Sequence, residues 1–205
     1  GSTDRVNVVC LFDRRDGWET TRRYFVQKDD KPDEITSPYE DLGELNMGNP
    51  QTLEAFVSWG AAAYPARHTA LILWNHGSGW QKREPPEVHI ENICSDDTDH
   101  DEITTTELTQ SLGLLTGNGD QKFDILGFDA CLMAMVETCY EYAPFADYCV
   151  GGEETLPFEG FAYDRILARL APHPEMPPLD LARVIAEESI AFYREQGDPE
   201  KFCIL

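Results

Sequence analysis

The feature that most constrains the fold is the alternation of short apolar runs with longer segments of helical periodicity. Val6–Phe12, His68–Trp74 and Phe123–Phe128 are almost continuously apolar, which is typical of strands buried on both faces. Helices are predicted from Pro50 to about Tyr64 and over Thr104–Leu115, Leu132–Tyr142, Phe161–Leu170 and Leu179–Glu195. Strands that alternate with helices indicate an α/β domain with a mostly parallel central sheet flanked by helices.

The remaining segments are assigned from alternation and turn residues. Arg22–Gln27 alternates and is predicted to pair antiparallel with the first strand, and Ala146–Val150 is predicted to be a short strand. Lys28–Pro50 and Asn75–Asp101 are polar, so we expect the first to be mostly loop and the second to lack regular structure. A loop as long as the second is usually functional or proteolytically cut in a compact domain.

The composition is that of a single globular domain. The chain has 205 residues, of which 41% are hydrophobic, enough for one substantial core. We therefore expect residues 1–205 to form one domain, with Gly1-Ser2 as a cloning remnant. The sequence contains no run of about 18 apolar residues, so no membrane span is expected.

The net charge limits the classes of molecule that the chain is expected to bind. The sequence has 16 Lys and Arg residues and 38 Asp and Glu residues, which gives a formal net charge of −22. Nucleic-acid binding needs a basic face, so the charge argues against that class of partner. It leaves three alternatives open: solubility alone, a basic substrate, or bound calcium.

The cysteines and histidines argue against zinc. The six cysteines include no Cys-x-x-Cys pair, and Cys10, Cys149 and Cys203 lie in apolar runs that predict buried thiols. A zinc hydrolase is therefore a weak third hypothesis. No zinc-ligand spacing occurs among His68, His76, His89, His100 and His173.

Two predicted strands are each followed closely by a reactive residue. His76 follows the strand that ends at Trp74, and Cys131 follows the strand that ends at Phe128, 55 residues later. Ligands of open α/β sheets bind beyond the carboxyl ends of the strands. If the two strands are parallel neighbours, the imidazole and the thiol leave the same edge of the sheet.

Such a pair can perform nucleophilic catalysis. A histidine can activate a cysteine and then protonate a leaving amine. Cys131 also opens the predicted helix Leu132–Tyr142, whose positive end would favour the thiolate. The backbone N–H groups of Gly77 and Cys131 are candidates for stabilising an oxyanion. The alternatives are a packed imidazole at His76 and an inert core thiol at Cys131.

Four segments carry recognisable motifs: Asp41–Gly48, Ile72–Trp80, Phe123–Ala134 and Gly151–Glu154. Together they resemble the clostripain-like family of cysteine peptidases. The match covers nearly the whole chain, and the His-Gly and Asp-Ala-Cys motifs are specific in combination.

The resemblance implies a caspase-like three-layer sandwich, a His76/Cys131 dyad and cleavage after Arg or Lys. It places Asp129 at the floor of the S1 pocket, which holds the residue before the cleaved bond, and Glu159 as a second acid of that pocket. A carboxylate pairs well with a guanidinium or an ammonium group. The alternatives are a turn or capping acid at Asp129 and a solvated loop acid at Glu159.

The resemblance also bears on the extent and location of the chain. Leu156–Phe161 departs from the Pro-Gly-Asp-Gly-Trp-like segment usual in the family, which leaves the depth of the pocket open. Family chains extend beyond both ends of this one, so we expect a domain truncated at both ends. The family is mostly bacterial and exported, which implies a secreted or cell-surface protein whose signal peptide is absent from this sequence.

Two further sites are hypotheses. Asp96, Asp97 and Asp99 belong to an acidic run that would bind calcium or remain a solvated loop. Lys82 and Arg83 follow the histidine in a long loop, where an enzyme that cuts after basic residues would process itself. The alternative for these two residues is a solvated basic pair.

The sequence thus predicts a cysteine endopeptidase that cleaves peptides or proteins after Arg or Lys. Its chemistry requires no cofactor, although calcium is a candidate ligand. The alternative is a catalytically inactive fragment or pseudoenzyme that binds basic peptides or calcium.

Overall fold

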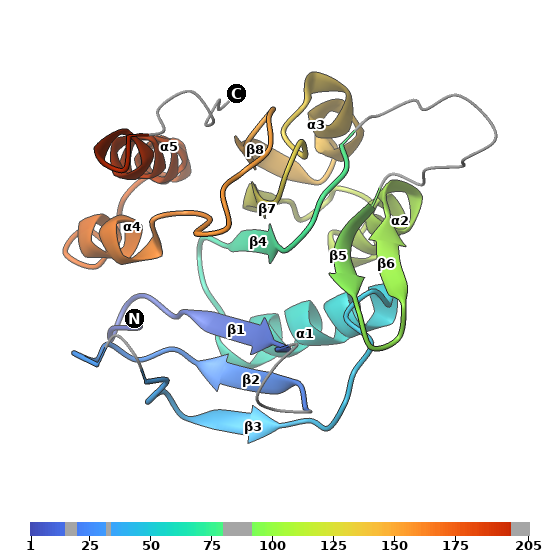
Figure 1. Ribbon diagram of the computed structural model, residues 1–205, viewed down its shortest axis with the longest axis horizontal. Coiled ribbons are helices and arrows are strands. Elements are labelled where there is room, and N and C mark those ends of the chain that lie inside the picture. Colours follow the sequence, from blue (N-terminus) through green and yellow to red (C-terminus); the bar gives the residue numbers. More distant parts are fainter. Residues whose placement is uncertain (15–19, 32–33, 80–91, 198–205) are drawn as a thin grey trace.

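A computed structural model describes residues 1–14, 20–31, 34–79 and 92–197. Figure 1 shows the elements, with the N-terminal strands below and the central sheet above them. In chain order they are β1 (Val9–Phe12), β2 (Arg22–Phe25), β3 (Tyr39–Asp41), α1 (Pro50–Ala63), β4 (Ala70–Trp74), β5 (Asn92–Asp96), β6 (Asp101–Thr104), α2 (Thr105–Leu115), β7 (Phe123–Asp129), α3 (Val136–Tyr142), β8 (Ala146–Gly151), α4 (Tyr163–Leu170) and α5 (Pro178–Glu195).

The central sheet has the strand order β4-β7-β8, and both strand pairs are parallel. Successive side chains of β7 point to opposite faces. Leu126 and Phe128 pack in the core that includes residues of α1, α2 and α3, whereas Ile125 packs in the core formed with α4 and α5 (Figure 1). The strands are thus buried on both faces, which confirms the α/β fold with a parallel sheet between two helical layers.

The first three strands form a second, antiparallel sheet with the order β1-β2-β3. It packs on α1, where the Phe25 and Tyr64 rings stack 5.1 Å apart and the Arg23 guanidinium lies 3.9 Å from the centre of the Trp59 ring. The predicted antiparallel pairing of β1 with β2 is confirmed. β3 lies within a segment that was expected to be mostly loop.

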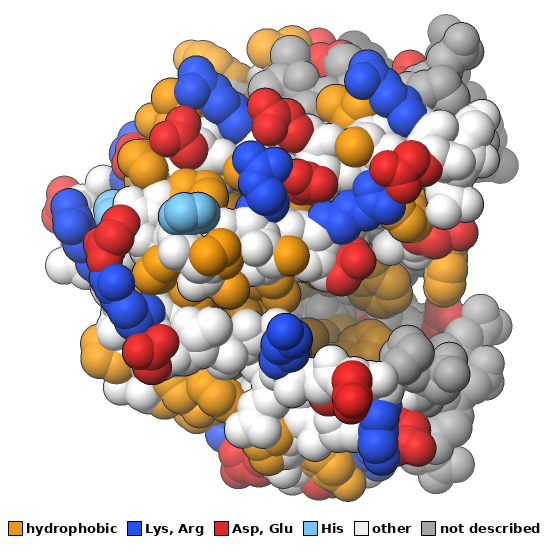
Figure 2. All heavy atoms as spheres, turned by 90° about the vertical axis from the view of Figure 1, so that its left-hand side faces the viewer, with side chains coloured by type: hydrophobic (Ala, Val, Ile, Leu, Met, Phe, Trp, Pro, Cys, Tyr) orange, Lys and Arg blue, Asp and Glu red, His pale blue; other side chains and the backbone are white. Residues whose placement is uncertain are grey.

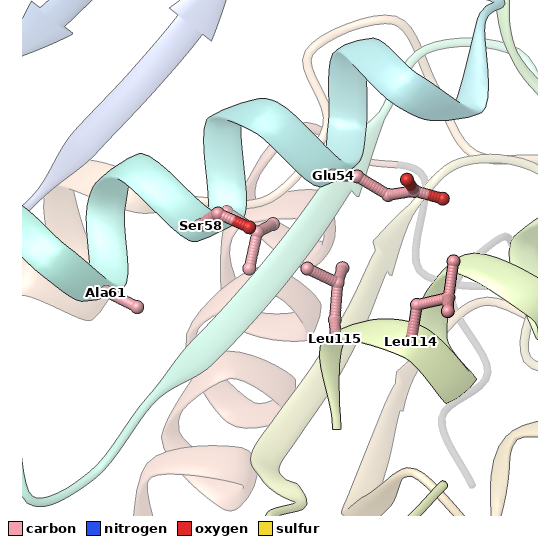
Figure 3. A pocket seen from close by; sticks show the side chains of 6 residues that line it. Glu54, Ser58, Ala61, Leu114 and Leu115 are labelled. Atoms are coloured by element: carbon pink, nitrogen blue, oxygen red, sulfur yellow. The ribbon is translucent and has the colours of Figure 1, made fainter. Parts of the chain in front are cut away.

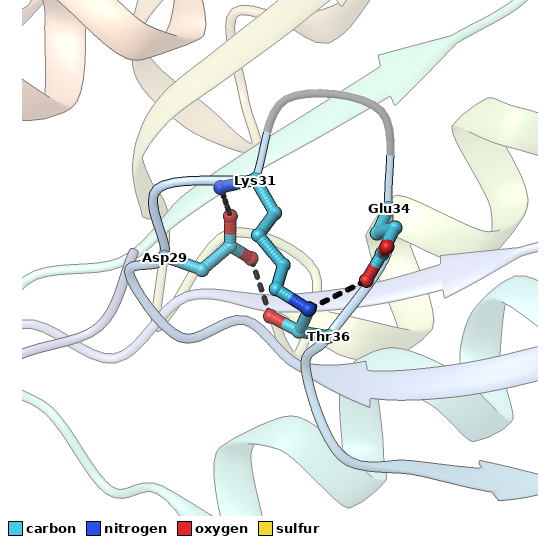
Figure 4. A network of polar contacts seen from close by, with 4 residues as sticks. All are labelled: Asp29, Lys31, Glu34 and Thr36. Carbon is cyan, nitrogen blue, oxygen red and sulfur yellow. Dashed lines mark hydrogen bonds and ion pairs between the residues drawn. The ribbon is translucent and has the colours of Figure 1, made fainter.

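A local polar network closes the connection between β2 and β3 (Figure 4). Asp29 accepts hydrogen bonds from the Lys31 backbone N–H at 3.0 Å and from the Thr36 hydroxyl at 2.6 Å, and Lys31 pairs with Glu34 at 2.8 Å. These bonds, led by that from Thr36, hold the pKa of Asp29 below its usual value. All four side chains of the network are exposed.

The helix starts follow the capping signals in the sequence. Asn49 caps α1 by accepting from the Gln51 N–H at 2.9 Å, and Pro50 occupies the first helical position, where its missing N–H has no cost. Thr104 caps α2, and Glu107 completes a reciprocal capping box.

Two predictions of local structure were wrong. The segment 75–101 was expected to lack regular structure, yet it contains β5, which pairs with β6 through the fully buried Ile93 and Ile103. A register shift between Ile93 and Asp96 interrupts the alternation that would have revealed this hairpin. The helix predicted from Leu132 begins only at Val136.

The face formed by α4 and α5 carries interspersed basic and acidic side chains (Figure 2). Arg165 pairs with Glu195, and Arg169 pairs with Glu188, across these two helices. These two arginines are therefore already paired with acids. Among the described residues, no helix is long and apolar enough to cross a membrane.

Candidate active site

The parallel pairing of β4 with β7 brings the two reactive strand ends together. Trp74 is the register partner of Asp129, and the Asn75 N–H donates to the Asp129 carbonyl oxygen at 3.4 Å. The condition that the sequence left open, that the two strands are parallel neighbours, is therefore met. The loops that carry His76 and Cys131 leave the same edge of the sheet.

Two glycines let these loops pack backbone against backbone. A Cβ atom on Gly77 would lie 2.6 Å from the Cys131 carbonyl oxygen, and one on Gly79 would lie 2.5 Å from the Leu132 carbonyl oxygen. Real Cβ atoms do not approach oxygen so closely, and Gly79 also has a φ of +55°. Only glycine at both positions allows the two loops to remain in contact.

The backbone is strained beside each candidate catalytic residue. Asn75, just before His76, has a φ of 128°, and Leu132, just after Cys131, has a φ of 64°. Side-chain-bearing residues rarely adopt such angles, and they persist only where surrounding contacts enforce them. The Asn75 side chain supplies one such contact by donating to the Ser95 carbonyl oxygen of β5 at 3.0 Å.

The turn after Cys131 is held by the loop that follows β8. Leu132 N–H donates to the Glu154 carbonyl oxygen at 3.1 Å, and Ala134 N–H donates to that of Gly152 at 3.2 Å. These bonds compete with helix formation and explain why α3 begins late. Cys131 therefore does not open a helix, and the expected support from a helix end is wrong.

A different backbone group faces the Cys131 sulfur. The thiol is partly buried, and its Sγ accepts a hydrogen bond from the Leu156 N–H at 3.3 Å. The thiol in turn donates to the Leu156 carbonyl oxygen at 3.8 Å, so the backbone of Leu156, and not a helix end, contacts the sulfur. Leu156 had no signal in the sequence, because its role depends on where the loop after β8 folds back.

The His76 ring is exposed and, within the described residues, makes no hydrogen bond to the Cys131 thiol. Catalytic hydrogen bonds are often long in unliganded enzymes and tighten when substrate binds. Within the same described part, the N–H groups of Gly77 and Cys131 have no hydrogen-bond acceptor. Both candidate oxyanion donors are thus uncommitted.

Asp129 is buried at the end of β7, with only 3% of its surface exposed. Its Oδ2 accepts hydrogen bonds from the Phe161 N–H at 3.0 Å and the Tyr163 hydroxyl at 2.8 Å, whereas its buried Oδ1 has no hydrogen-bond partner. Burial raises the pKa of Asp129, and the two hydrogen bonds only partly oppose that rise. Burial and the neighbouring carboxyl of Asp129 in turn raise the pKa of Tyr163.

Glu159 lies beside this buried acid. It is exposed in a turn that the Gly160 N–H closes on the Pro157 carbonyl oxygen at 3.1 Å. Gly160 covers Asp129 so closely that a Cβ there would lie 2.5 Å from Oδ2. Tyr193 donates to the Gly160 carbonyl oxygen at 2.6 Å, and its pKa is raised to about 12 by burial and by the charges of Asp129 and Glu159.

The acidic run does not form the cluster proposed from the sequence. Asp97 and Asp99 are exposed, whereas Asp96 is buried and accepts from the backbone N–H groups of Thr98, Asp99 and Met47. Carboxylate oxygens of Asp96, Asp13 and Glu44 lie within 4.8 Å of one another. The sequence could not indicate this set, because its members come from three distant segments.

One further pocket in the described part of the chain lies on other elements. A pocket between α1 and α2 is lined by residues such as Glu54, Leu114 and Leu115 (Figure 3). Its lining includes the Ser58 hydroxyl but no histidine, and Glu54 already accepts a hydrogen bond from Ser111 at 2.7 Å. Lys82 and Arg83, the candidate processing residues, lie outside the described part of the chain.

Comparison with known proteins identifies the family of this site. The sequence model of peptidase family C11, the clostripain family, matches residues 1–201. The chain belongs to the clostripain family. Clostripain from Hathewaya histolytica is 32% identical to it over 193 residues, which cover 80% of this chain and 36% of clostripain.

Solved structures support the clostripain-family fold. A secreted C11 cysteine protease from Bacteroides thetaiotaomicron, bound to an irreversible peptide inhibitor, superposes with a TM-score of 0.70 at 22% identity. An inactive zymogen of a C11 protease from Parabacteroides distasonis superposes with a TM-score of 0.64 at 21% identity. Each match covers 93% of this chain and 49% of the other. The chain therefore spans between about a third and a half of these relatives, and the caspase-like fold is confirmed.

The glycine contact between the two loops predicts a large stability difference between two Gly→Ala substitutions. Gly77→Ala forces a methyl group onto the Cys131 carbonyl oxygen and should destabilise the clostripain-family domain by about 2–3 kcal/mol. Gly60→Ala is the control, because Gly60 lies within helix α1 and a Cβ there would meet only the Val9 side chain, at 3.8 Å. That change should be neutral or stabilise by up to about 1 kcal/mol. Equal midpoints in urea unfolding would contradict the close loop contact.

The raised pKa of Asp129 predicts how stability depends on pH. Ionising a buried carboxyl costs stability, so the Asp129 protein should weaken relative to Asp129→Asn as the pH rises. The change begins above the ordinary pKa of about 3.9 and is complete only above the raised folded-state pKa. Asp147→Asn, at an exposed position of β8, is the control. Urea unfolding across this pH range should show the trend for Asp129 alone, and a flat or opposite trend would refute it.

Proposed function

We propose that this chain carries the catalytic centre of a cysteine endopeptidase, with Cys131 as nucleophile and His76 as its acid–base partner. The observation that carries this proposal is the parallel register of β4 and β7, which places both residues at one sheet edge. The contact of Gly77 with Cys131 and the Leu156 N–H on the sulfur support it. Membership of the clostripain family agrees with this chemistry.

The reaction is an acyl transfer in two steps. The Cys131 thiolate attacks the carbonyl carbon of the scissile peptide bond, and the N–H groups of Gly77 and Cys131 stabilise the oxyanion. His76 protonates the departing amine, which leaves an acyl-enzyme. Neutral His76 then takes a proton from water, which attacks the thioester, releases the carboxylic acid and regenerates the thiolate and the protonated imidazole. These steps involve side-chain and backbone groups of the chain and require no cofactor.

We further propose that Asp129 selects a basic residue before the cleaved bond. Its Oδ1 is buried without a hydrogen-bond partner, and a buried acceptor in that state gains most from a charged donor. Glu159 adds negative charge at the exposed turn above it. Such a pocket disfavours acidic side chains, because it would bring like charges together.

The dyad predicts distinct losses for two substitutions. Cys131→Ala should abolish cleavage of peptides with arginine before the scissile bond, and His76→Ala should reduce kcat/KM by about 10³-fold. His173→Ala is the matched control, because His173 is exposed in the connection between α4 and α5. Rates would be measured with a fluorogenic peptide, and each variant would be checked for folding by circular dichroism. Cleavage retained by Cys131→Ala would refute the mechanism.

Binding and labelling experiments distinguish an enzyme from a non-catalytic domain that binds basic peptides. A folded but inactive parent protein that still binds an arginine peptide would indicate a non-catalytic binding domain instead. A thiol-reactive peptide with arginine at its reactive end should label Cys131 in the enzyme. The absence of labelling in the folded parent protein would favour the alternative.

The specificity proposal predicts a selective effect at Asp129. Asp129→Asn should lower kcat/KM for arginine or lysine before the scissile bond by about 100-fold and leave a neutral residue nearly unaffected. Glu159→Gln should have a smaller effect, because Glu159 is exposed. Activity on basic substrates should fall as the pH drops through the raised pKa of Asp129, because the protonated acid loses its charge. An unchanged substrate profile in Asp129→Asn would exclude this role.

Three sequence-based hypotheses remain open. Calcium binding is tested by running the peptide assay with and without a chelator. Self-cleavage after Lys82 or Arg83 is tested by intact mass, with Cys131→Ala as the uncleavable control. Export is tested by locating the full-length protein in its host, because relatives described as secreted support that location.

A further inference from the structure

Two cysteines outside the proposed catalytic site contact each other between helix α3 and strand β8. Cys139 belongs to α3 and Cys149 to β8, and their sulfur atoms lie 2.7 Å apart. Both side chains are partly buried. Unbonded sulfurs normally remain farther apart, and a disulfide bond measures about 2.05 Å. Little movement separates this pair from a covalent bond.

The two thiols also differ from the other described cysteines. The two thiols share a hydrogen bond in which either sulfur can donate, and this bond lowers the pKa of Cys139 and raises that of Cys149. Burial instead raises the pKa of Cys10 to about 11 and that of Cys94 to about 12, and neither is paired with another sulfur. Thiol exchange needs a thiolate with access to its target, so Cys139 is the better candidate for attack.

We propose that Cys139 and Cys149 form a disulfide that fastens α3 to β8 under oxidising conditions. Cys139 as thiolate attacks one sulfur of a small-molecule disulfide and releases one thiolate. Cys149 as thiolate then attacks the Cys139 sulfur of this mixed disulfide and releases the second. The protein loses two electrons and two protons, and the small disulfide becomes two thiols. The proposal does not depend on peptidase activity.

The position of the bond gives it a structural consequence. Helix α3 directly follows the turn of Cys131, and β8 directly precedes the loop that holds this turn. The two backbone bonds from Leu132 and Ala134 to that loop join the same two segments. A disulfide between Cys139 and Cys149 would limit their separation and reduce the opening of these hydrogen bonds. The oxidised protein should therefore have a more rigid nucleophile turn.

Formation of the bond is tested in Cys131→Ala protein, which removes the competing nucleophile. Trypsin releases residues 123–165 as one peptide, because Lys122 and Arg165 are consecutive cleavage sites. After treatment with oxidised glutathione, that peptide should be two hydrogens lighter and should resist alkylation until it is reduced. Uptake of two alkyl groups, or glutathione attached without a bridge, would refute the bond. So would a bridge to another cysteine.

The structural consequence has its own measurement. Closing a loop of this length should raise Tm by about 5 °C, and reductant should reverse the shift. Cys139→Ser and Cys149→Ser, each combined with Cys131→Ala, should show no such shift. Hydrogen exchange at the amides of Leu132 and Ala134 should slow about tenfold in the oxidised parent protein. If the bond forms but exchange at these amides is unchanged, the proposed stiffening of the turn is wrong. The mass measurement decides bond formation even if a double variant fails to fold.

Discussion

The structure depends on the parallel pairing of β4 with β7. This pairing aligns the ends of two strands that are about fifty residues apart in the chain, so the loops beyond Trp74 and Asp129 must share one edge. Parallel strands are joined only by long crossovers, and here the crossover contains the β5–β6 hairpin and α2. The hairpin also supports the loop of His76, because the Ser95 carbonyl oxygen of β5 accepts a hydrogen bond from the strained Asn75. A shift of one residue in the register would move every contact between the two loops.

The buried carboxyl of Asp129 lowers the stability of the folded protein at the candidate site. Its carboxyl is enclosed by Gly160, Phe161 and Tyr163, and one oxygen has no hydrogen-bond partner. Burial of an ionisable group with an unmatched acceptor is unfavourable in the free protein. Under the specificity proposed above, a positively charged side chain of the substrate would offset that cost on binding. Tyr193 helps to keep Gly160 over the acid, because its hydroxyl donates to the Gly160 carbonyl oxygen at 2.6 Å.

The sequence predicted the layers and most elements because those depend on local signals. Apolar runs marked β4 and β7, and capping residues marked the starts of α1 and α2. It missed features set by distant backbone contacts. The turn after Cys131 looked helical, but its N–H groups bind the loop after β8, and nothing in the local sequence reveals that competition. The meeting of Asp96 with Asp13 and Glu44 was hidden for the same reason, because it joins three segments.

Backbone groups carry much of the geometry around the candidate nucleophile. The sulfur of Cys131 faces the N–H of Leu156, its loop is held by carbonyl oxygens of Gly152 and Glu154, and Gly77 packs directly on its carbonyl oxygen. Backbone contacts tolerate changes of side chain except where a Cβ would clash. A few glycines and the strand register can therefore preserve the arrangement while other positions diverge. The caspase-like fold shared at 22% identity with a TM-score of 0.70 agrees with this tolerance.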